Sequence, residues 1–247
     1  MTYKVVTCVT TYNRYDYLKK FVESWVSTKD DSFDNYLIVA DDGSSDGLTK
    51  KYISAIKSKN IIIIENNRVG ISSQTNSLLK KSIEIGFDYG FKCDDDIWFE
   101  KKGWQSLYIN AINSSKYDHL CYYNSKWIKE SRKTISVGLL KSKTSVIDCM
   151  GCFWTFTPNV IKEVGMFDEK SFGFMGHEHI DYSMRCCRAG FNNMINLFDA
   201  NYSNEYINMV GRKEGYKSSI HSAQIKICPK EKKKRWSIIF NKNRIKI

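Results

Sequence analysis

Blocks of apolar residues alternate with amphipathic stretches through the first part of the chain. Short apolar, β-branched runs predict buried strands at residues 4–9, 36–40, 61–64 and 89–93. Apolar residues at helical spacing predict helices at residues 18–26, 48–56 and 72–83, the last with Ser72 or Ser73 as its cap. This repeated alternation favours an α/β fold with a mostly parallel, twisted sheet and helices on both faces.

The second half of the chain is less regular. Residues 117–150 hold short β-rich stretches, and Pro158 suits the first turn of a helix that runs to Val164. Residues 180–189 predict a helix that stops at Gly190. The 42% of hydrophobic and 14% of aromatic residues are enough for one full core, which excludes a disordered chain.

Polar residues follow each of the predicted strands. They form four clusters, at residues 10–14, 41–46, 68–70 and 94–96. In open parallel sheets, ligands bind at the carboxyl ends of the strands. We therefore expect the four clusters to converge on one site.

Three adjacent carboxylates, Asp94 to Asp96, follow the last of these strands. Such groups repel one another unless a cation lies near them. Oxygen ligands suit Mg²⁺ or Mn²⁺, which commonly bridge to substrate phosphates. The alternative is a solvated acidic turn. A second carboxylate pair, Asp41 and Asp42, at another strand end of the same sheet weakens that alternative.

Six short motifs occur in order along residues 4–191. They are Thr10 to Arg14, Ala40 to Asp46, Asn67 to Gly70 with Asn76, Asp94 to Asp96, Gly151 to Phe153 with Val164 to Glu169, and Gly176 to Arg185. In this order they resemble the successive motifs of GT-A fold, family 2-type glycosyltransferases. The resemblance implies a single GT-A (Rossmann-like) domain. Its expected parts are a nucleotide-binding half at residues 1–100, an acceptor-binding half at 101–225, and a C-terminal tail at 226–247.

The same resemblance implies an inverting glycosyltransferase that uses a nucleotide diphosphate sugar, expected to be a UDP-sugar. The acceptor would be a hydroxyl of a glycan or of a lipid-linked molecule, in the assembly of bacterial surface polysaccharide or lipopolysaccharide. Mn²⁺ or Mg²⁺ is the implied cofactor. The implied donor-binding residues are Thr10, Tyr12, Arg14, Asp41, Asp42, Arg68, Asp94 and Asp95, with Thr10, Tyr12 and Asp42 at the nucleotide base.

Two alignments of the acidic cluster leave the metal ligand open. The usual family 2 pattern places it at Asp95, with Cys93 where an Asp often stands. A lysine-led triple-aspartate motif of other GT-A enzymes matches the segment that starts at Lys92 and places the ligand at Asp96, which we favour. His221 is a further candidate ligand, because enzymes of this fold often close a C-terminal loop over the donor.

The expected catalytic group lies at the start of a helix. Glu178-His179-Ile180-Asp181 stands where the family usually has Glu-Asp-x-Asp, so His179 replaces the usual base. An ordinary histidine pKa of about 6.5 suits a general base near neutral pH. Glu178 is the alternative base, or it orients the acceptor. Asp181 either takes part in catalysis or has a structural role, such as holding Arg185.

Positive charge is concentrated at the C-terminal end. Residues 226–247 contain nine Lys or Arg and one Glu, a net charge of +8, which leaves about +3 of the total +11 for the rest of the chain. Nucleic acid is therefore not an expected partner of the main domain. The tail mixes its basic residues with Trp236 and Phe240, a composition that can lie on an anionic membrane surface. The alternative is a solvated, frayed terminus.

The sequence also indicates a cellular compartment. No run approaches the ~20 apolar residues of a membrane span, and residues 1–4 lead into a strand without a signal-peptide pattern. We expect a cytoplasmic protein that can lie peripherally on the inner face of the cytoplasmic membrane. The eight cysteines include one C-x-x-C, at residues 149–152, which without a second pair is weak evidence for zinc or redox chemistry. Reduced thiols are the expectation.

Two other functions fit parts of the pattern. A sugar nucleotidyltransferase shares a phosphate–metal site, but it usually needs a Gly-rich loop after the first strand, and residues 10–14 contain no glycine. A non-enzymatic module that binds nucleic acid or membranes would depend on the tail. Neither GxGxxG nor GxxxxGK[ST] occurs, which disfavours a Rossmann dehydrogenase and a P-loop enzyme.

Overall fold

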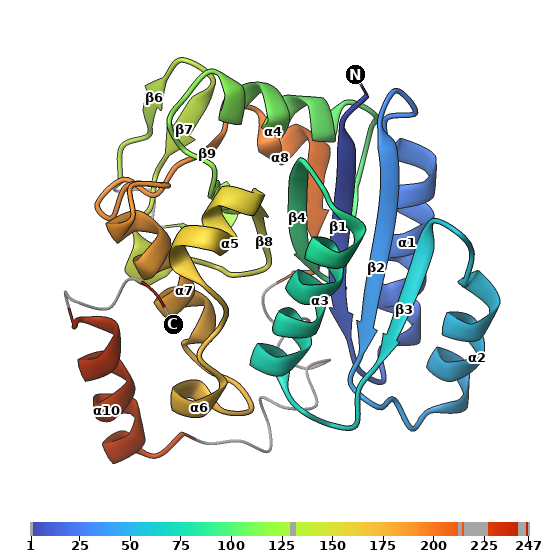
Figure 1. Ribbon diagram of the computed structural model, residues 1–247. Coiled ribbons are helices and arrows are strands. Elements are labelled where there is room, and N and C mark those ends of the chain that lie inside the picture. Colours follow the sequence, from blue (N-terminus) through green and yellow to red (C-terminus); the bar gives the residue numbers. More distant parts are fainter. Residues whose placement is uncertain (1, 129–131, 212–213, 215–226, 242–245, 247) are drawn as a thin grey trace.

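Five strands form the central sheet, in the order β3–β2–β1–β4–β8 (Figure 1). In this computed structural model their bounds are β1 Lys4–Thr11, β2 Asp34–Asp41, β3 Ile61–Glu65, β4 Tyr89–Asp94 and β8 Phe153–Phe156. The first four strands run parallel, and β8 pairs with β4 in the antiparallel direction. The structure describes residues 2–128, 132–211, 214, 227–241 and 246.

Helices cover both faces of this sheet. They include α1 Tyr15–Thr28, α2 Gly47–Ile56, α3 Ile71–Ile85, α4 Trp104–Asn113 and α7 Glu178–Arg188. Val5 and Val9 of β1 belong to a core that contains α1 and α4 residues, whereas Val6 and Cys8 belong to a second core with α3 and α7. Successive strand side chains point to opposite faces, and here both faces are covered. This is why the strands are apolar throughout rather than alternating.

The second half of the chain adds shorter elements beside β8. Two small antiparallel sheets contain β6 Ile135–Val137, β7 Leu140–Ser142 and β9 Asp199–Ala200, and β5 Ile97–Phe99 with β10 Ile207–Met209. The remaining helical elements are η1 Ser125–Trp127, η2 Val146–Asp148, α5 Pro158–Val164, α6 Glu169–Phe172, α8 Ser203–Tyr206 and α10 Pro229–Ile239. Most of these elements lie to the left of the parallel strands in Figure 1.

The elements predicted from the hydrophobic pattern are confirmed, with ends that move by a few residues. Pro158 is the first residue of α5, as predicted. The expected helix at residues 180–189 begins slightly earlier, at Glu178. The predicted cap at Ser72 or Ser73 is wrong, because α3 begins at Ile71 and Gly70 precedes it with a φ of 87°. Glycine adopts that backbone conformation without the steric cost that a side chain brings.

The described part of the C-terminal tail is folded. The helix α10 packs on α6 and α7, beside which it lies in Figure 1. Ile239 is fully buried, and Arg188 of α7 donates to the Ile239 carbonyl at 2.6 Å. A frayed terminus therefore does not describe residues 229–239, which pack against helices of the second half of the chain.

Two expectations about the compartment can be compared with the structure. All eight cysteines are free thiols, and seven of them are buried, whereas Cys228 is exposed. Among the helices of the described ranges, none has both the length and the apolar character needed to cross a bilayer.

Candidate active site

A cavity of about 390 Å³ opens at the carboxyl ends of the parallel strands. Its walls come from the ends of β1, β2 and β4, the start of α3, the loop before β8 and the loop into α7. The residues singled out from the sequence that line it are Thr10, Tyr12, Arg14, Asp42, Arg68, Asp94, Asp95, Glu178 and His179. The strand ends thus meet at one edge of the sheet, as parallel topology requires.

Arg68 lies where Tyr12 and Asp42 meet. Its Nη1 donates to Oδ2 of Asp42 at 2.9 Å, and its guanidinium carbon lies 3.4 Å from the centre of the Tyr12 ring. The ring of Phe174, from the opposite wall, lies 4.8 Å from the same carbon. A guanidinium stacks on aromatic faces and pairs with a carboxylate at once, which stabilises this arrangement. A planar ligand that enters between Tyr12 and Asp42 would share this space with Arg68.

Asp42 also builds the loop that precedes α3. The backbone N–H groups of Val69 and Gly70 donate to its Oδ1 and Oδ2 at 2.6 and 3.1 Å. Arg68 itself has a φ of 56°, which is uncommon for a residue other than glycine. Because a buried carboxylate needs hydrogen-bond donors, the position of Asp42 and the shape of this loop depend on each other.

Two cations partly neutralise the acidic turn after β4. Arg14 reaches Asp95 Oδ1 with Nη1 and Asp96 Oδ2 with Nη2, each at 3.0 Å. Lys92, which is almost fully buried, pairs with Asp94. Three carboxylates therefore face two cations, and one negative charge remains without a matching positive charge in this group.

The pKa values of the turn reflect this excess of negative charge. Burial raises the pKa of Asp95 to about 7, against the charge of Arg14, and the charge of Asp96 adds to the rise. The pKa of Asp96 is also raised, first by burial and then by the charge of Asp94. Since both shifts mean that the charged form is disfavoured, an added cation would be stabilised at this turn.

The donor atoms fit Mg²⁺ or Mn²⁺ as part of a ligand set. Asp95 is 2% exposed, and its oxygens already bind Thr11 Oγ1 at 2.7 Å and Arg14. The side chain of Asp94 is 34% exposed and lines the cavity; Asp96 does not line it, but its side chain is 18% exposed. Nowhere in the described ranges do three His, Cys, Asp or Glu side chains gather to hold an ion alone. Substrate oxygens would have to complete the shell, as is common for Mg²⁺.

Glu178 and His179 form a hydrogen-bonded pair at the start of α7. His179 Nδ1 lies 3.1 Å from Glu178 Oε1, and the N–H of Gly176 donates to Oε2. Burial alone would raise the pKa of Glu178, but His179 and the backbone donors outweigh it and lower the pKa to about 2. Burial alone would lower the pKa of His179, but Glu178 outweighs it and raises the pKa to about 9. At neutral pH the resting pair is a carboxylate and an imidazolium.

Gly151 sets how closely the chain approaches the His179 ring. Its φ is 71°, and an added Cβ would lie 2.6 Å from Cγ of His179. Glycine is therefore required at this position both for the backbone conformation and for the space. The ring packs on this backbone, Glu178 binds its Nδ1, and the residue lines the cavity.

Other predicted site residues have different surroundings. Asp41 binds the N–H and the hydroxyl of Ser44 inside its own turn and does not line the cavity. Asp181 is 1% exposed, accepts from Arg185 Nε at 2.9 Å and does not line the cavity, an environment that favours the structural alternative. Breaking a buried pair of this kind typically costs about 3–5 kcal/mol. His221 lies outside the described residues.

Several lining residues were not singled out from the sequence as site residues. They include Gln74, Lys92, Trp154, Phe167 and Met175. Lys92 could have been found, because it leads the aspartate motif directly. The aromatic residues gave no signal, since a buried Trp or Phe is first of all a core residue.

Sequence comparisons connect this site to known proteins. The family model "Glycosyl transferase family 2" matches residues 7–165, more than half of the chain. "Uncharacterized glycosyltransferase R363" of Acanthamoeba polyphaga mimivirus is 31% identical over 180 residues, which cover 70% of this chain and 66% of that protein. The chain thus spans just under two thirds of the length of this curated relative.

Solved structures share the fold at low sequence identity. S. aureus TarS 1–349 in complex with UDP-GlcNAc has a TM-score of 0.67 at 15% identity, over 96% of this chain and 65% of that one. Mannosyltransferase PcManGT from Pyrobaculum calidifontis, in complex with GDP-Man and Mn²⁺, has a TM-score of 0.57 at 14% identity, over 77% and 53%. The predicted α/β fold with its mostly parallel sheet is confirmed by this likeness. Together with the family match, it shows that the chain belongs to glycosyl transferase family 2, with a GT-A fold.

Proposed function

We propose that this cavity transfers a sugar from a nucleotide diphosphate sugar to an acceptor hydroxyl. The observation that carries the proposal is the meeting of three chemically different groups in one space. Tyr12 and Asp42 suit a nucleotide base, the acidic turn suits a diphosphate with its metal ion, and the Glu178–His179 pair suits an acceptor hydroxyl. The donor needs the first two of these groups, for its base and its diphosphate, and the transfer needs the third to accept the proton of the acceptor.

His179 is the proposed general base. Its Nε2, once deprotonated, takes the proton of the acceptor hydroxyl while the acceptor oxygen bonds to the anomeric carbon. The bond between that carbon and the diphosphate oxygen breaks, and the nucleotide diphosphate leaves. Glu178 orients the ring through Nδ1 and stabilises the imidazolium that forms, as carboxylates do in other acid–base pairs. Attack opposite the leaving group inverts the anomeric configuration.

Asp94 and Asp96 are the proposed ligands of a Mn²⁺ or Mg²⁺ ion. Both are more accessible than Asp95, whose two oxygens are held by Thr11 and Arg14, whereas one oxygen of Asp96 pairs with Arg14 and one of Asp94 with Lys92. The sequence already favoured Asp96 over Asp95 as a metal ligand. The accessibility of Asp94 adds it as a second proposed ligand. When bound, the ion would neutralise charge on the diphosphate as it departs.

A UDP-sugar is the proposed donor, and a glycan or lipid-linked molecule the proposed acceptor. TarS was solved with UDP-GlcNAc, and GalNAc-T7, with a TM-score of 0.63 at 12% identity over 81% of this chain and 42% of that one, with UDP, GalNAc and Mn²⁺. PcManGT, solved with GDP-Man, makes a guanosine donor the main competitor. Assembly of bacterial surface polysaccharide or lipopolysaccharide, on the cytoplasmic side of the membrane, is the proposed setting. It rests on the motif resemblance.

Thermal shift with a panel of nucleotide sugars, with and without Mn²⁺, tests the proposal. A donor that binds the native state raises the melting temperature, by mass action. We expect UDP-sugars to do so only with the metal. Turnover should then release UDP, whereas a sugar nucleotidyltransferase would release pyrophosphate. NMR of the product reports the anomeric configuration, and a retained configuration would refute the single displacement.

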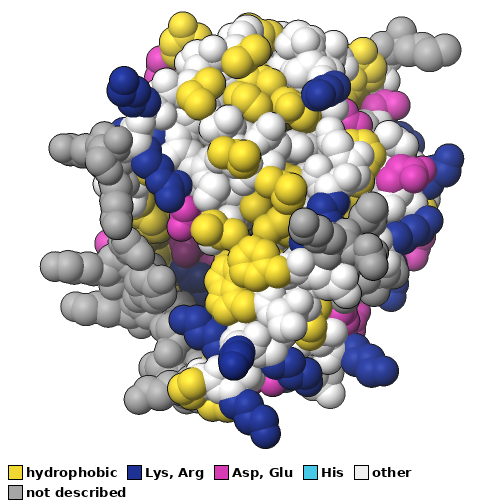
Figure 2. All heavy atoms as spheres, turned by 90° about the vertical axis from the view of Figure 1, so that its left-hand side faces the viewer, with side chains coloured by type: hydrophobic (Ala, Val, Ile, Leu, Met, Phe, Trp, Pro, Cys, Tyr) yellow, Lys and Arg dark blue, Asp and Glu magenta, His cyan; other side chains and the backbone are white. Residues whose placement is uncertain are grey.

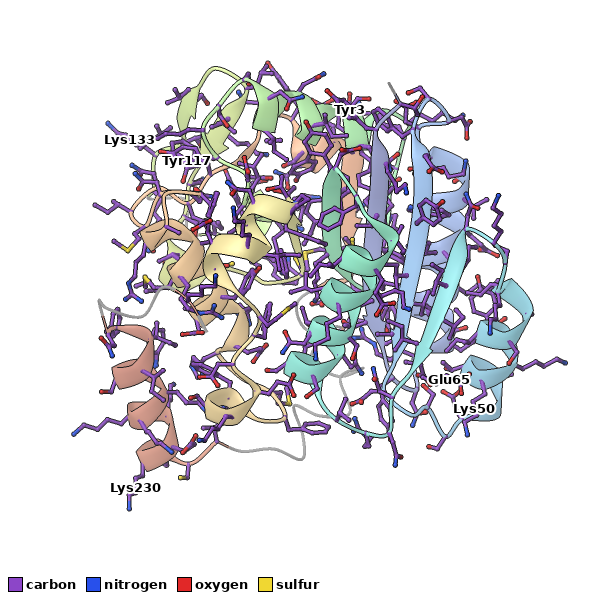
Figure 3. All side chains as sticks on the ribbon, in the orientation of Figure 1. Tyr3, Lys50, Glu65, Tyr117, Lys133 and Lys230 are labelled. Atoms are coloured by element: carbon purple, nitrogen blue, oxygen red, sulfur yellow. The ribbon has the colours of Figure 1, made fainter. Side chains whose placement is uncertain are left out.

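The outer side of α10 is proposed to contact an anionic membrane. Lys230, Lys232, Lys233 and Lys234 are exposed there, and Phe240 is 56% exposed just beyond the helix. Lys230 points away from the body of the protein in Figure 3. Figure 2 shows basic side chains gathered on the lower part of this face, below a more apolar part. Basic residues near an anionic surface each contribute about 1 kcal/mol.

Flotation with lipid vesicles tests this contact. Vesicles that contain phosphatidylserine should bind the protein, those of phosphatidylcholine alone should not, and salt should weaken the binding. Glutamine at the four α10 lysines should abolish it. The matched control changes Lys50, Lys51, Lys57 and Lys59, four exposed lysines around α2, where Lys50 lies at the opposite edge of Figure 3. Equal loss with both sets would contradict a specific face.

A further inference from the structure

The inner side of α10 contacts the loop that leads into α7, the helix that begins with Glu178 and His179. Arg235, 8% exposed, donates from Nη1 to the carbonyls of Met175 and Gly176, each at 2.7 Å. Its Nε donates to Glu231 of the same helix at 3.0 Å, which fixes the orientation of the guanidinium. A residue of the expected tail is thus bonded to backbone some 60 positions earlier in the chain.

One peptide group links Arg235 to Glu178. The carbonyl of Met175 accepts from Arg235, and the N–H of the same peptide, which belongs to Gly176, donates to Glu178 Oε2. A charged donor on a peptide carbonyl polarises the group and strengthens its N–H as a donor. Arg235 therefore supports the carboxylate in two ways, by placing the N–H and by polarising it.

The surrounding contacts keep this loop in one conformation. Gly176 has a φ of 104°, and an added Cβ would lie 2.4 Å from Cδ1 of Ile227. The next residue, His177, has a φ of 67°, and its ring packs edge-on against Trp236 with 5.1 Å between centroids. Backbone in this region is held there by its neighbours. Of these neighbours, Trp236 belongs to α10 and Ile227 lies two residues before it.

We infer that Arg235 is a positioning residue for the Glu178–His179 pair and acts through the peptide between Met175 and Gly176. The assignment of a catalytic purpose rests on the proposed function, but the linkage itself does not. A plain alternative is that Arg235 only fastens α10 to the body. Arg188 provides the comparison, because it also joins α7 to α10, through the Ile239 carbonyl, without bonding the loop before α7.

The test compares Arg235→Gln and Arg235→Lys with two controls, Arg188→Gln and Lys170→Gln. Lys170 is an exposed lysine of α6, which packs on α10, so its variant removes one positive charge nearby without removing the bonds of Arg235. The first readout is the titration of the His179 imidazole by NMR, without any donor. The titratable groups that affect this ring are Glu178, Cys149, Asp94 and the nearby His177. None of the four variants replaces any of these residues.

In the wild type we expect the ring to titrate near pH 9. Arg235→Gln should move the midpoint down by about one pH unit or more towards the ordinary value of ~6.5, because the carboxylate that raises it is no longer held. Arg235→Lys keeps the positive charge but lacks the planar guanidinium. The midpoint of the imidazole titration should therefore lie between those of the wild type and Arg235→Gln. Both controls should match the wild type. If both Arg235 variants are folded, as circular dichroism reports, and titrate like the wild type, the inference is overturned.

Kinetics form the second readout. Above pH 9, where the imidazole is deprotonated in the wild type and in the variants alike, Arg235→Gln should lower kcat about tenfold or more, since small displacements of catalytic groups are costly. The donor KM should stay the same, because Arg235 does not line the cavity. A change in donor KM alone would contradict the inference. If no variant and no wild type transfers sugar while the NMR shift is seen, the proposed function fails and the linkage stands.

Discussion

The wall of the cavity proposed to face the donor takes its polar side chains from the ends of neighbouring parallel strands, whereas the wall proposed to be catalytic takes them from loops and a helix start. They are called the donor wall and the catalytic wall below. On the first wall, Thr11, Arg14 and the acidic turn bind one another across β1 and β4. On the second, Glu178 depends on Gly176 and, through it, on α10. The first wall therefore inherits its geometry from the sheet, and the second from tertiary packing.

This difference matters for how each wall tolerates change. A strand end is held by the ladder on both sides, since β1 pairs with β2 and with β4 up to its last residues. The loop into α7 has no such ladder and contains two residues with positive φ, Gly176 and His177. We expect substitutions in the catalytic wall to affect turnover, and those in the donor wall to affect binding.

The largest expected effect comes from His179→Ala, which tests the catalytic wall directly. Loss of a general base typically costs 10²–10⁴-fold, so kcat should fall by about a thousandfold. Donor binding should survive, because the groups proposed for the base and diphosphate are untouched. Stopped turnover assays and isothermal titration with the donor measure the two quantities. A variant that keeps normal kcat would remove His179 from the mechanism and leave Glu178 as the base.

The acidic turn gives the next largest effect. Asp94→Asn and Asp96→Asn should each lower activity about a hundredfold and raise the Mn²⁺ concentration needed for half-maximal rate, since each loses a proposed ligand. Asp95→Asn should instead lower the melting temperature, because Asp95 binds Thr11 and Arg14. Metal titrations after treatment with EDTA separate these outcomes. Full activity of the wild type in EDTA would end the metal proposal.

The pH dependence distinguishes the two members of the catalytic pair. A base must be deprotonated to act, and the pKa of His179 is raised to about 9. The rate constant kcat/KM, which reports the free enzyme, should therefore rise about tenfold per pH unit up to that value and level off above it. Glu178→Gln removes the raising group, so the rise should move to lower pH.

A flat profile from pH 5 upwards would fit Glu178 as the base, because its pKa is lowered to about 2. The stability of the pair has a corresponding sign. The raised pKa of His179 stabilises the fold below its unfolded pKa of ~6.5, and this contribution is lost as pH rises through about 9. Melting temperatures over the same pH range check it.

The sequence predicted the donor wall better than the catalytic wall, and the reason is physical. Strand ends of a parallel sheet must meet at one edge, so the proximity of Thr10, Asp42 and Asp94 could be predicted from the sequence alone. Asp41 shows the limit of this kind of prediction. The side chain at the end of an apolar strand can bind within its own turn instead of facing the cavity. Arg235 could not have been found at all, since nothing in a basic tail indicates which residue reaches a loop elsewhere in the chain.

The two walls also touch, and the smallest predicted effect concerns that contact. Arg68 stacks on Tyr12 of the donor wall and lies near Phe174 of the catalytic wall. Arg68→Ala should weaken donor binding about tenfold, in keeping with the ~0.5–2 kcal/mol of a cation–π contact plus its ion pair with Asp42. Lys20→Ala is the matched control, because Lys20 covers a ring, that of Trp98, and neither residue lines the cavity.

Whether the walls act separately follows from the same variant. If Arg68→Ala changes the donor Kd but not kcat, the stacking of Arg68 on Tyr12 has no effect on the catalytic wall. The N–H of Ile71, three residues after Arg68, donates to the Phe174 carbonyl at 3.0 Å, so a route for coupling exists. A combined Arg68→Ala, Phe174→Leu variant should then lose less kcat than the two single variants together, because groups in contact are not additive. Strict additivity in both Kd and kcat would show that the sheet-built wall and the loop-built wall are independent.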